Sequence, residues 1–200
     1  MFYLVGLGNP GEEHKESRHN TGRMAILKLL KDLKIEDLKF EKKANALISK
    51  NELGKEKVTF VLPETFMNKS GSAISYFIKP KTGKSKAIEN LVVIYDDIDL
   101  PIGTMKISFN KGSGGHRGVE SIIKAIKTRE FARIRIGISP TTLSGKIKKP
   151  EGEKKVLDFI LGNFKPKERE ILKKVFKQVA QAVETMITES REIAMNRFNQ

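Results

Sequence analysis

The stretch Leu91-Val92-Val93-Ile94-Tyr95 is continuously apolar, and the acidic run Asp96-Asp97-Ile98-Asp99 follows it directly. An unbroken apolar and β-branched run of this length predicts a central strand that is buried on both faces of a sheet. Functional side chains gather at the ends of such strands, because loops there are held on a rigid scaffold. We therefore expect the strand at 91–95 to organise the fold and the acidic run to border a site.

Segments on either side of this strand alternate between strand-like and helix-like patterns. Further strands are predicted at residues 2–7, 46–48, 58–62 and 132–138, and the two at 46–48 and 58–62 have the pattern of a hairpin. Helices are predicted at about 24–33, 70–77 and 119–126, and one long helix at about 167–196 carries a single apolar stripe. This alternation predicts the α/β class.

Two polar segments have the composition of loops. Residues 79–86 are rich in Lys and contain Pro and Gly, which break regular structure. Residues 139–155 are rich in Lys, Gly, Pro, Ser and Thr. We expect 139–155 to be a mobile basic loop and a candidate lid beside a site.

The composition excludes several classes of site. The chain has 200 residues, 38 Lys and Arg against 24 Asp and Glu, and no Cys. This length predicts a single domain over residues 1–200, with a core that needs no disulfide or metal. The lack of Cys excludes a Cys nucleophile, a Cys-ligated zinc and an iron–sulfur cluster, and favours a reducing cytoplasm. We expect no signal peptide and no membrane span.

The net charge of +14 favours a nucleic-acid partner, although a solvated Lys-rich surface has the same composition.

Three patterns for binding phosphate or metal are incomplete. Gly6-x-Gly8-x-x-Gly11 follows a predicted strand as a dinucleotide fingerprint does, but Pro10 and a polar loop at 12–20 separate it from the next helix. Gly83-Lys84-Ser85 lacks the earlier glycine and the leading strand of a P-loop. Carboxylates at 96–99 are possible Mg²⁺ ligands, but no second acidic cluster nearby completes such a site. The favoured roles for this run are a capped turn or a carboxylate that orients a histidine.

The chemistry at this site is predicted to use an activated water. No Gly-x-Ser-x-Gly elbow is present, since Lys111-Gly112-Ser113-Gly114 lacks the first glycine. Histidine is the natural base for water near neutral pH, and His14, His19 and His116 are the candidates. His19 is favoured because it lies in a loop that follows a strand end. For any one histidine, a structural role is the alternative.

Two motifs near the N-terminus form a pair, Gly6-Leu7-Gly8-Asn9-Pro10-Gly11 and Ser17-Arg18-His19-Asn20-Thr21-Gly22. Further motifs follow at residues 63–71, 96–103 and 112–118, with a weaker one at 133–138. In this order, they resemble the motifs of the bacterial-type peptidyl-tRNA hydrolases, and the resemblance extends from residue 1 to about 197. Several ordered motifs are far more specific than one glycine pattern.

The resemblance implies one α/β domain with a twisted mixed sheet flanked by helices, acting as a monomer without cofactor or metal. It implies hydrolysis of the ester between peptide and tRNA in peptidyl-tRNA, which recycles tRNA from stalled translation. By the same resemblance, His19 is the general base and Asp96 orients its imidazole. Asn68 then hydrogen-bonds near the attacked carbonyl or the water, and Asn9 recognises the peptide group.

The resemblance also implies residues that bind substrate. Phe66 and Met67 are expected to line the channel for the peptide or the tRNA 3′ end. Our candidates for contact with tRNA phosphates are Lys106, Lys111 and Arg135, which would read charge and shape with little base specificity.

Two residues depart from the family pattern. His14 stands where Tyr is common, and it keeps a flat ring that can stack on a base or sugar. Arg117 stands where Asn is common; it is longer, always charged and unable to accept a hydrogen bond. Arg117 is expected to grip phosphate or, near His19, to oppose formation of the imidazolium. Because this change touches the site, the alternative function is an RNA-binding protein of the same fold without hydrolysis.

Overall fold

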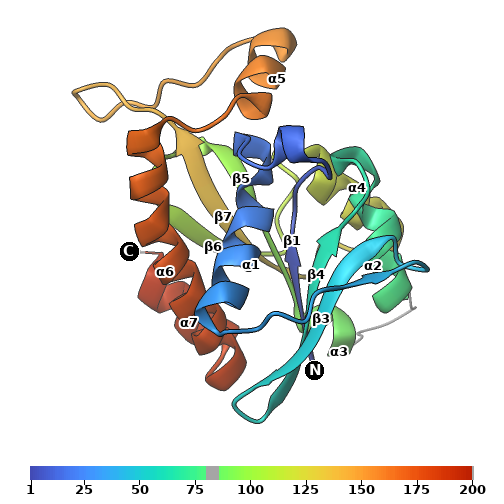
Figure 1. Cartoon of the computed structure of the whole chain (residues 1–200). Helices are drawn as coiled ribbons and strands as arrows, with labels where there is room; N and C mark the ends of the chain where they lie inside the picture. The colour runs from blue at the N-terminus through green and yellow to red at the C-terminus, as the bar shows by residue number, and fades with distance from the viewer. Residues whose placement is uncertain (80–85, 200) are drawn as a thin grey trace.

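A mixed β-sheet forms the centre of the computed structural model, which describes residues 1–79 and 86–199 (Figure 1). The strands are β1 (Phe2–Gly6), β2 (Lys39–Glu41), β3 (Ala46–Leu53), β4 (Glu56–Pro63), β5 (Leu91–Pro101), β6 (Met105–Phe109) and β7 (Ala132–Ser139). Their order across the sheet is β2-β3-β4-β1-β5-β7-β6. β1 pairs in parallel with β4 and β5, β5 pairs in parallel with β7, and the other pairs are antiparallel. The α/β class, the mixed sheet and the β3–β4 hairpin are thus confirmed.

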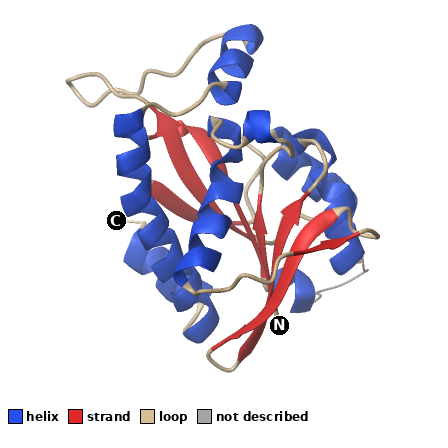
Figure 2. Ribbon diagram, in the orientation of Figure 1, coloured by secondary structure: helices blue, strands red, loops and turns tan. Residues whose placement is uncertain are grey.

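Helices cover both faces of the sheet (Figure 2). They are α1 (Thr21–Asp32), α2 (Ser70–Phe77), α3 (Lys86–Glu89), α4 (Arg117–Ile126), α5 (Glu153–Leu161), α6 (Pro166–Thr188) and α7 (Arg191–Phe198). One apolar cluster joins α1, α6 and α7 to one face, and a second joins α2, α3 and α4 to the other. α5 contains no buried residue and projects from the body beyond the end of the sheet (Figure 1). None of the helices in the described part of the chain is long and apolar enough to cross a membrane.

β5 is the central strand that the apolar run predicts. Val92 and Ile94 belong to one apolar cluster, whereas Leu91, Val93 and Tyr95 belong to the other. The strand does not stop at Tyr95, however, as the sequence suggested. It continues to Pro101, because its partner β7 extends the ladder past the first two aspartates of the acidic run. The Asp96 side chain is thereby fixed on a strand rather than carried on a loop.

Two glycines bring α1 directly against the sheet. A Cβ atom on Gly22 would lie 2.0 Å from the carbonyl oxygen of Ile94 on β5, and one on Gly6 would lie 2.6 Å from the carbonyl oxygen of Gly22. Only glycine permits this approach. The glycine pattern that resembles a dinucleotide fingerprint therefore includes a residue that serves close helix–strand packing. It also places the start of α1, and the turn before it, beside β5.

The structure corrects the prediction of one long C-terminal helix at 167–196. α6 ends at Thr188, and a new helix, α7, begins after Ser190, whose hydroxyl accepts the backbone N–H of Ile193 (3.1 Å). The apolar stripe of α6 ends at Ile187, and the polar run 188–192, which contains the capping serine, separates the two helices. α7 turns back, so that the Asn199 side chain exchanges two hydrogen bonds with Ile107 on the edge strand β6.

The predicted loops at 79–86 and 139–155 have different outcomes. The first falls almost wholly on residues 80–85, which lie outside the described residues. The second is shorter than predicted, since β7 includes Ser139 and α5 begins at Glu153. An acidic residue in the first turn of a helix interacts favourably with the helix dipole, which explains the early start. The mobility of the segment between them stays a prediction.

Candidate active site

A cavity of about 810 Å³ opens at the ends of β1, β4 and β5, where the loops after these strands meet the start of α4 and one side of α5. Parallel strands bring their carboxyl ends to one edge, so groups far apart in the sequence converge there. The cavity is lined by all of the predicted catalytic residues and by five of the predicted substrate residues: Asn9, His14, His19, Phe66, Met67, Asn68, Asp96 and Arg117.

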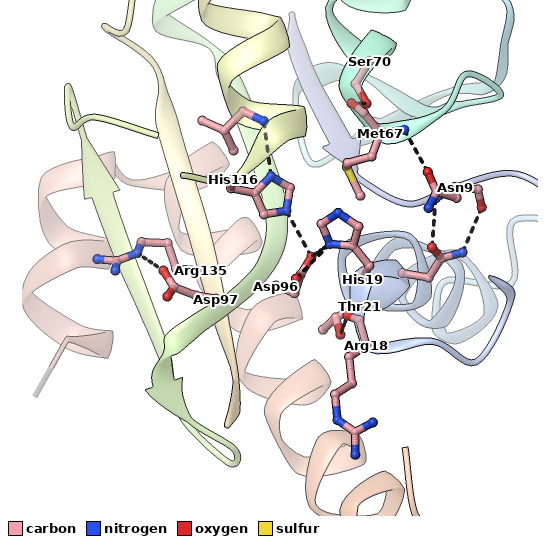
Figure 3. A network of polar contacts seen from close by, with 12 residues as sticks. Asn9, Arg18, His19, Thr21, Met67, Ser70, Asp96, Asp97, His116 and Arg135 are labelled. Carbon is pink, nitrogen blue, oxygen red and sulfur yellow. Dashed lines mark hydrogen bonds and ion pairs between the residues drawn. The ribbon is translucent and has the colours of Figure 1, made fainter. Parts of the chain in front are cut away.

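Asp96 lies between two histidines at the inner wall of the cavity (Figure 3). His19 Nδ1 is 3.0 Å from both carboxylate oxygens, and His116 Nε2 is 3.1 Å from Oδ1. The Asp96 side chain is only 4% exposed, and each histidine side chain is 8% exposed. An ionised carboxylate only accepts hydrogen bonds, so both of these ring nitrogens must carry protons.

The protonation of the two rings follows from their other contacts. The backbone N–H of Val119 donates to His116 Nδ1 (3.3 Å), so this nitrogen accepts and carries no proton. In neutral His19, Nδ1 holds the proton and Nε2 keeps the free lone pair. His19 is thus the histidine of this pair that can take a proton from water.

Electrostatics support an ionised Asp96 and a basic His19. Burial raises the pKa of Asp96, but His19 and His116 outweigh it, and the pKa lies far below its ordinary value. Burial lowers the pKa of His19, but the charge and hydrogen bond of Asp96 more than reverse this effect, so the pKa is raised above 6.5. Arg117 opposes that rise, in the direction that its positive charge requires.

The turn that carries His19 is held by a set of short polar contacts. His19 lies on the 3₁₀ turn η2 (Arg18–Asn20), directly before α1. Asn20 Oδ1 accepts the backbone N–H of Asn9 (2.8 Å), and Asn20 Nδ2 donates to the Asn9 carbonyl (2.9 Å). Asn9 Oδ1 in turn accepts the N–H of Met67 (2.8 Å). Because its oxygen is occupied, Asn9 offers its Nδ2 group as a donor on the cavity wall.

The remaining predicted residues differ in exposure and partners. Asn68 is exposed in the cavity, and its side chain has no hydrogen-bond partner among the described residues. Phe66 is 61% exposed at the cavity, whereas Met67 is almost fully buried. The Arg117 guanidinium forms an exposed ion pair with Glu153 on α5 (2.8 Å).

Three predicted tRNA contacts do not line the cavity: Lys106, Lys111 and Arg135. Lys106 and Arg135 are opposite each other on β6 and β7. Arg135 Nε donates to Asp97 Oδ2 (2.6 Å), so part of its charge is already paired (Figure 3). Lys106 and Lys111 are exposed. Contact of these residues with tRNA stays a prediction.

Sequence reasoning missed two features of the site. His116 was a candidate base, but its role as second partner of Asp96 depends on how α4 starts. The sequence signal that could have indicated this role is the position of His116 within the motif at 112–118. The apolar wall that α5 contributes, with Val156, Leu157 and Ile160, was also missed. The sequence signal for this wall is the helical spacing of these apolar residues after the basic segment, which predicts a helix there.

His19, Asp96 and His116 are also the described residues whose donor atoms lie close enough to suit a metal ion, all within 4.8 Å of one another. Two imidazoles and a carboxylate are ligands that transition metals accept. Here His19 Nδ1 and His116 Nε2 both face Asp96 as hydrogen-bond donors, so a metal would have to replace both protons. The facing atoms of these three side chains already satisfy one another by hydrogen bonding, as in an acid–base site.

Comparisons with known proteins point to one family. A family model described as peptidyl-tRNA hydrolase matches residues 3–200. A peptidyl-tRNA hydrolase of Alkaliphilus oremlandii (strain OhILAs) is 38% identical over 205 residues, with 100% of both chains covered. One from Aquifex aeolicus (strain VF5) is 38% identical over 201 residues, 98% of this chain and 95% of that one. The crystal structure of peptidyl-tRNA hydrolase from Acinetobacter baumannii has a TM-score of 0.85 at 27% identity, covering 100% of this chain and 94% of that chain. These full-length matches in sequence and fold show that the chain belongs to the peptidyl-tRNA hydrolase family.

Proposed function

We propose that this protein hydrolyses the ester between peptide and tRNA in peptidyl-tRNA, using a water activated by His19. The observation that carries the proposal is the state of His19. Its Nδ1–H is held by a buried carboxylate, so that Nε2 is the basic nitrogen at a cavity wall. Family membership and the names of the relatives support the same reaction.

The reaction needs one base and one donor. His19 Nε2 takes a proton from water while the water oxygen attacks the ester carbonyl carbon, which becomes a tetrahedral oxyanion. The Asn68 amide donates a hydrogen bond to this oxyanion, and Asp96 stabilises the imidazolium. The bond to the ribose oxygen then breaks, and that oxygen takes the proton from His19. The products are the free peptide acid and tRNA with a free hydroxyl.

Recognition of the peptide falls to Asn9 and the apolar walls. Asn9 Nδ2 is free to donate to a peptide carbonyl, because Asn9 Oδ1 is held by the backbone of Met67. Phe66 and the inner side of α5 provide apolar surface beside it. A free aminoacyl-tRNA would place a charged amine against this surface, and its desolvation is costly. The site is thereby expected to prefer substrates with a blocked amine.

The excess of basic residues supports binding of the tRNA. With a net charge of +14, the protein attracts phosphate, and Lys106, Lys111, Arg135 and Arg117 are the proposed contacts. His14 at the cavity wall is proposed to stack on a base or sugar. All the proposed catalytic groups come from one chain, which supports action as a monomer. The lack of Cys supports a cytoplasmic location.

A second candidate function is RNA binding without hydrolysis, and Arg117 is the observation in its favour. Its ion pair with Glu153 joins two exposed side chains, 60% and 85% exposed. Exposed pairs of this kind contribute little, about 0–1 kcal/mol, so a phosphate can displace the carboxylate. An arginine that binds an RNA phosphate at the cavity would be useful to a protein that only binds RNA as well as to an enzyme.

The deciding experiment is release of N-acetyl-amino acid from N-acetyl-aminoacyl-tRNA by the purified protein. We expect turnover that is lost in His19→Ala, with tRNA binding retained, and that is indifferent to a transition-metal chelator. His14→Ala is the matched histidine control, for which we expect a modest rise in KM at unchanged kcat. Tight tRNA binding without turnover would favour the binding protein instead. Turnover that the chelator removes and zinc restores would assign a metal to the His19 site.

A further inference from the structure

The Arg18 side chain points away from the cavity, although Arg18 directly precedes His19 on η2 (Figure 3). Only 8% of the side chain is exposed. Nη1 donates to the carbonyls of Gly162 (3.1 Å) and Asn163 (2.7 Å), and Nη2 donates to Glu168 Oε2 (2.9 Å). One buried side chain therefore joins the turn that carries His19 to the segment between α5 and α6.

Two aromatic rings hold the same guanidinium. Its central carbon is 4.6 Å from the ring centre of Phe159, near the end of α5, and 5.1 Å from that of Phe164, just before α6. Glu168, the carboxylate that binds Arg18, also accepts the backbone N–H of Lys165 (2.6 Å) and so caps α6. A planar group held by a fork of hydrogen bonds and by ring faces cannot be replaced by lysine without loss.

These contacts attach α5 to η2. α5 has no buried residue, and its inner side lines the cavity through Val156, Leu157 and Ile160. Its C-terminal end is held where Phe159 and Gly162 contact Arg18. The backbone N–H of Arg18 also donates to the Gly162 carbonyl (3.0 Å). These contacts form a direct connection between α5 and the turn that carries His19.

We infer that Arg18 is a positioning residue for His19 and couples the α5 wall to the catalytic imidazole. The inference rests on the proposed function, which assigns α5 to the peptide and His19 to the water. η2 is three residues long, so Arg18 and His19 share one turn and a shift of one moves the other. The Nδ1–Asp96 contact of 3.0 Å depends on that turn.

Arg18→Lys tests the inference, with Arg169→Gln as the matched control. Arg169 lies on α6 and pairs with Glu16 beside the same turn, but that pair is partly exposed. We expect Arg18→Lys to lower kcat about tenfold or more at similar KM, because misplacement of a catalytic group by about 1 Å has effects up to about a hundredfold. The acid limb of the pH–rate profile and the NMR titration of His19 should both move to lower pH, as the imidazole loses its carboxylate. Arg169→Gln should change neither.

A merely structural Arg18 would lower the melting temperature and leave kcat, the acid limb and the His19 titration unchanged, and that result would overturn the inference. If Arg18→Lys does not fold, Phe159→Leu replaces it, since Phe159 contacts the guanidinium without lining the cavity. The same shifts, smaller in size, are expected there, and their absence would equally overturn the coupling. A wild-type protein without turnover would instead refute the proposed function, and the His19 titration would still decide the positioning.

Discussion

Replacement of Asp96 by Asn is expected to reverse the tautomer of His19. Asp96 accepts from two imidazoles, whereas an Asn amide has one accepting oxygen and one donating NH₂ group. His116 cannot change its tautomer easily, because its Nδ1 accepts the backbone N–H of Val119. The amide oxygen would therefore face His116 and the NH₂ group would face His19. His19 would then carry its proton on Nε2, where it cannot act as a base.

The size of the effect follows from burial. Asp96 is 3% exposed, so the imidazolium formed during the reaction would lack its buried counter-ion. Removal of one partner from a buried pair costs about 3–5 kcal/mol. At about 1.4 kcal/mol per tenfold in rate, this predicts a fall in kcat of about 10² to 10⁴. KM should change little, because Asp96 lies behind the histidines and its oxygens are occupied by them.

Single-turnover release of N-acetyl-amino acid from N-acetyl-aminoacyl-tRNA measures this effect. Asp99→Asn is the matched control: Asp99 belongs to the same acidic run, but it is exposed and pairs with Lys149 (2.6 Å). It should retain nearly full activity. A fall in kcat of less than tenfold in a folded Asp96→Asn protein would refute the assignment of tautomers and the role of the carboxylate.

Three further changes test other parts of the account. His116→Ala should lower kcat less than Asp96→Asn, because His19 keeps its acceptor, and should destabilise the fold by about 1–3 kcal/mol in urea unfolding through the lost α4 cap; unchanged stability would contradict the cap. Arg117→Asn should raise the pKa of His19 in an NMR titration, since Arg117 lowers it; equal pKa values in the two proteins would remove this role. Gly22→Ala should lower stability by more than about 3 kcal/mol, because its Cβ would lie 2.0 Å from a β5 carbonyl oxygen; a loss of under about 1 kcal/mol would show that α1 can move away.

Local patterns predicted the elements that local forces determine. The apolar run at 91–95 and the β3–β4 hairpin could be read directly, since burial and alternation leave clear traces in sequence. The extension of β5 through the acidic run could not, because it depends on β7, which comes some 30 residues later. The break before α7 was missed because the predicted helix was extended past Ile187, where its apolar stripe ends, through the polar run that contains the capping Ser190.

The candidate site, like the fold, could be predicted from the sequence only in part. The family motifs made His19 and Asp96 candidate functional residues, but no sequence pattern shows that residues 77 positions apart meet at 3.0 Å. The second histidine on Asp96 depends on the start of α4, and Arg135 was proposed for tRNA without knowledge of its bond to Asp97. These contacts depend on the pairing of strands that are distant in the sequence, and no local sequence pattern reveals that pairing.

The pH dependence of kcat/KM, measured beside the NMR titration of His19 in the free protein, tests the central claim most directly. kcat/KM reports the ionisation of the free enzyme, and His19 must be unprotonated to act as a base. Because the pKa of His19 is raised above 6.5, activity should fall as pH drops through a value above 6.5 that coincides with the titrated pKa. An acid limb that does not follow the His19 titration would contradict the assignment of His19 as the general base.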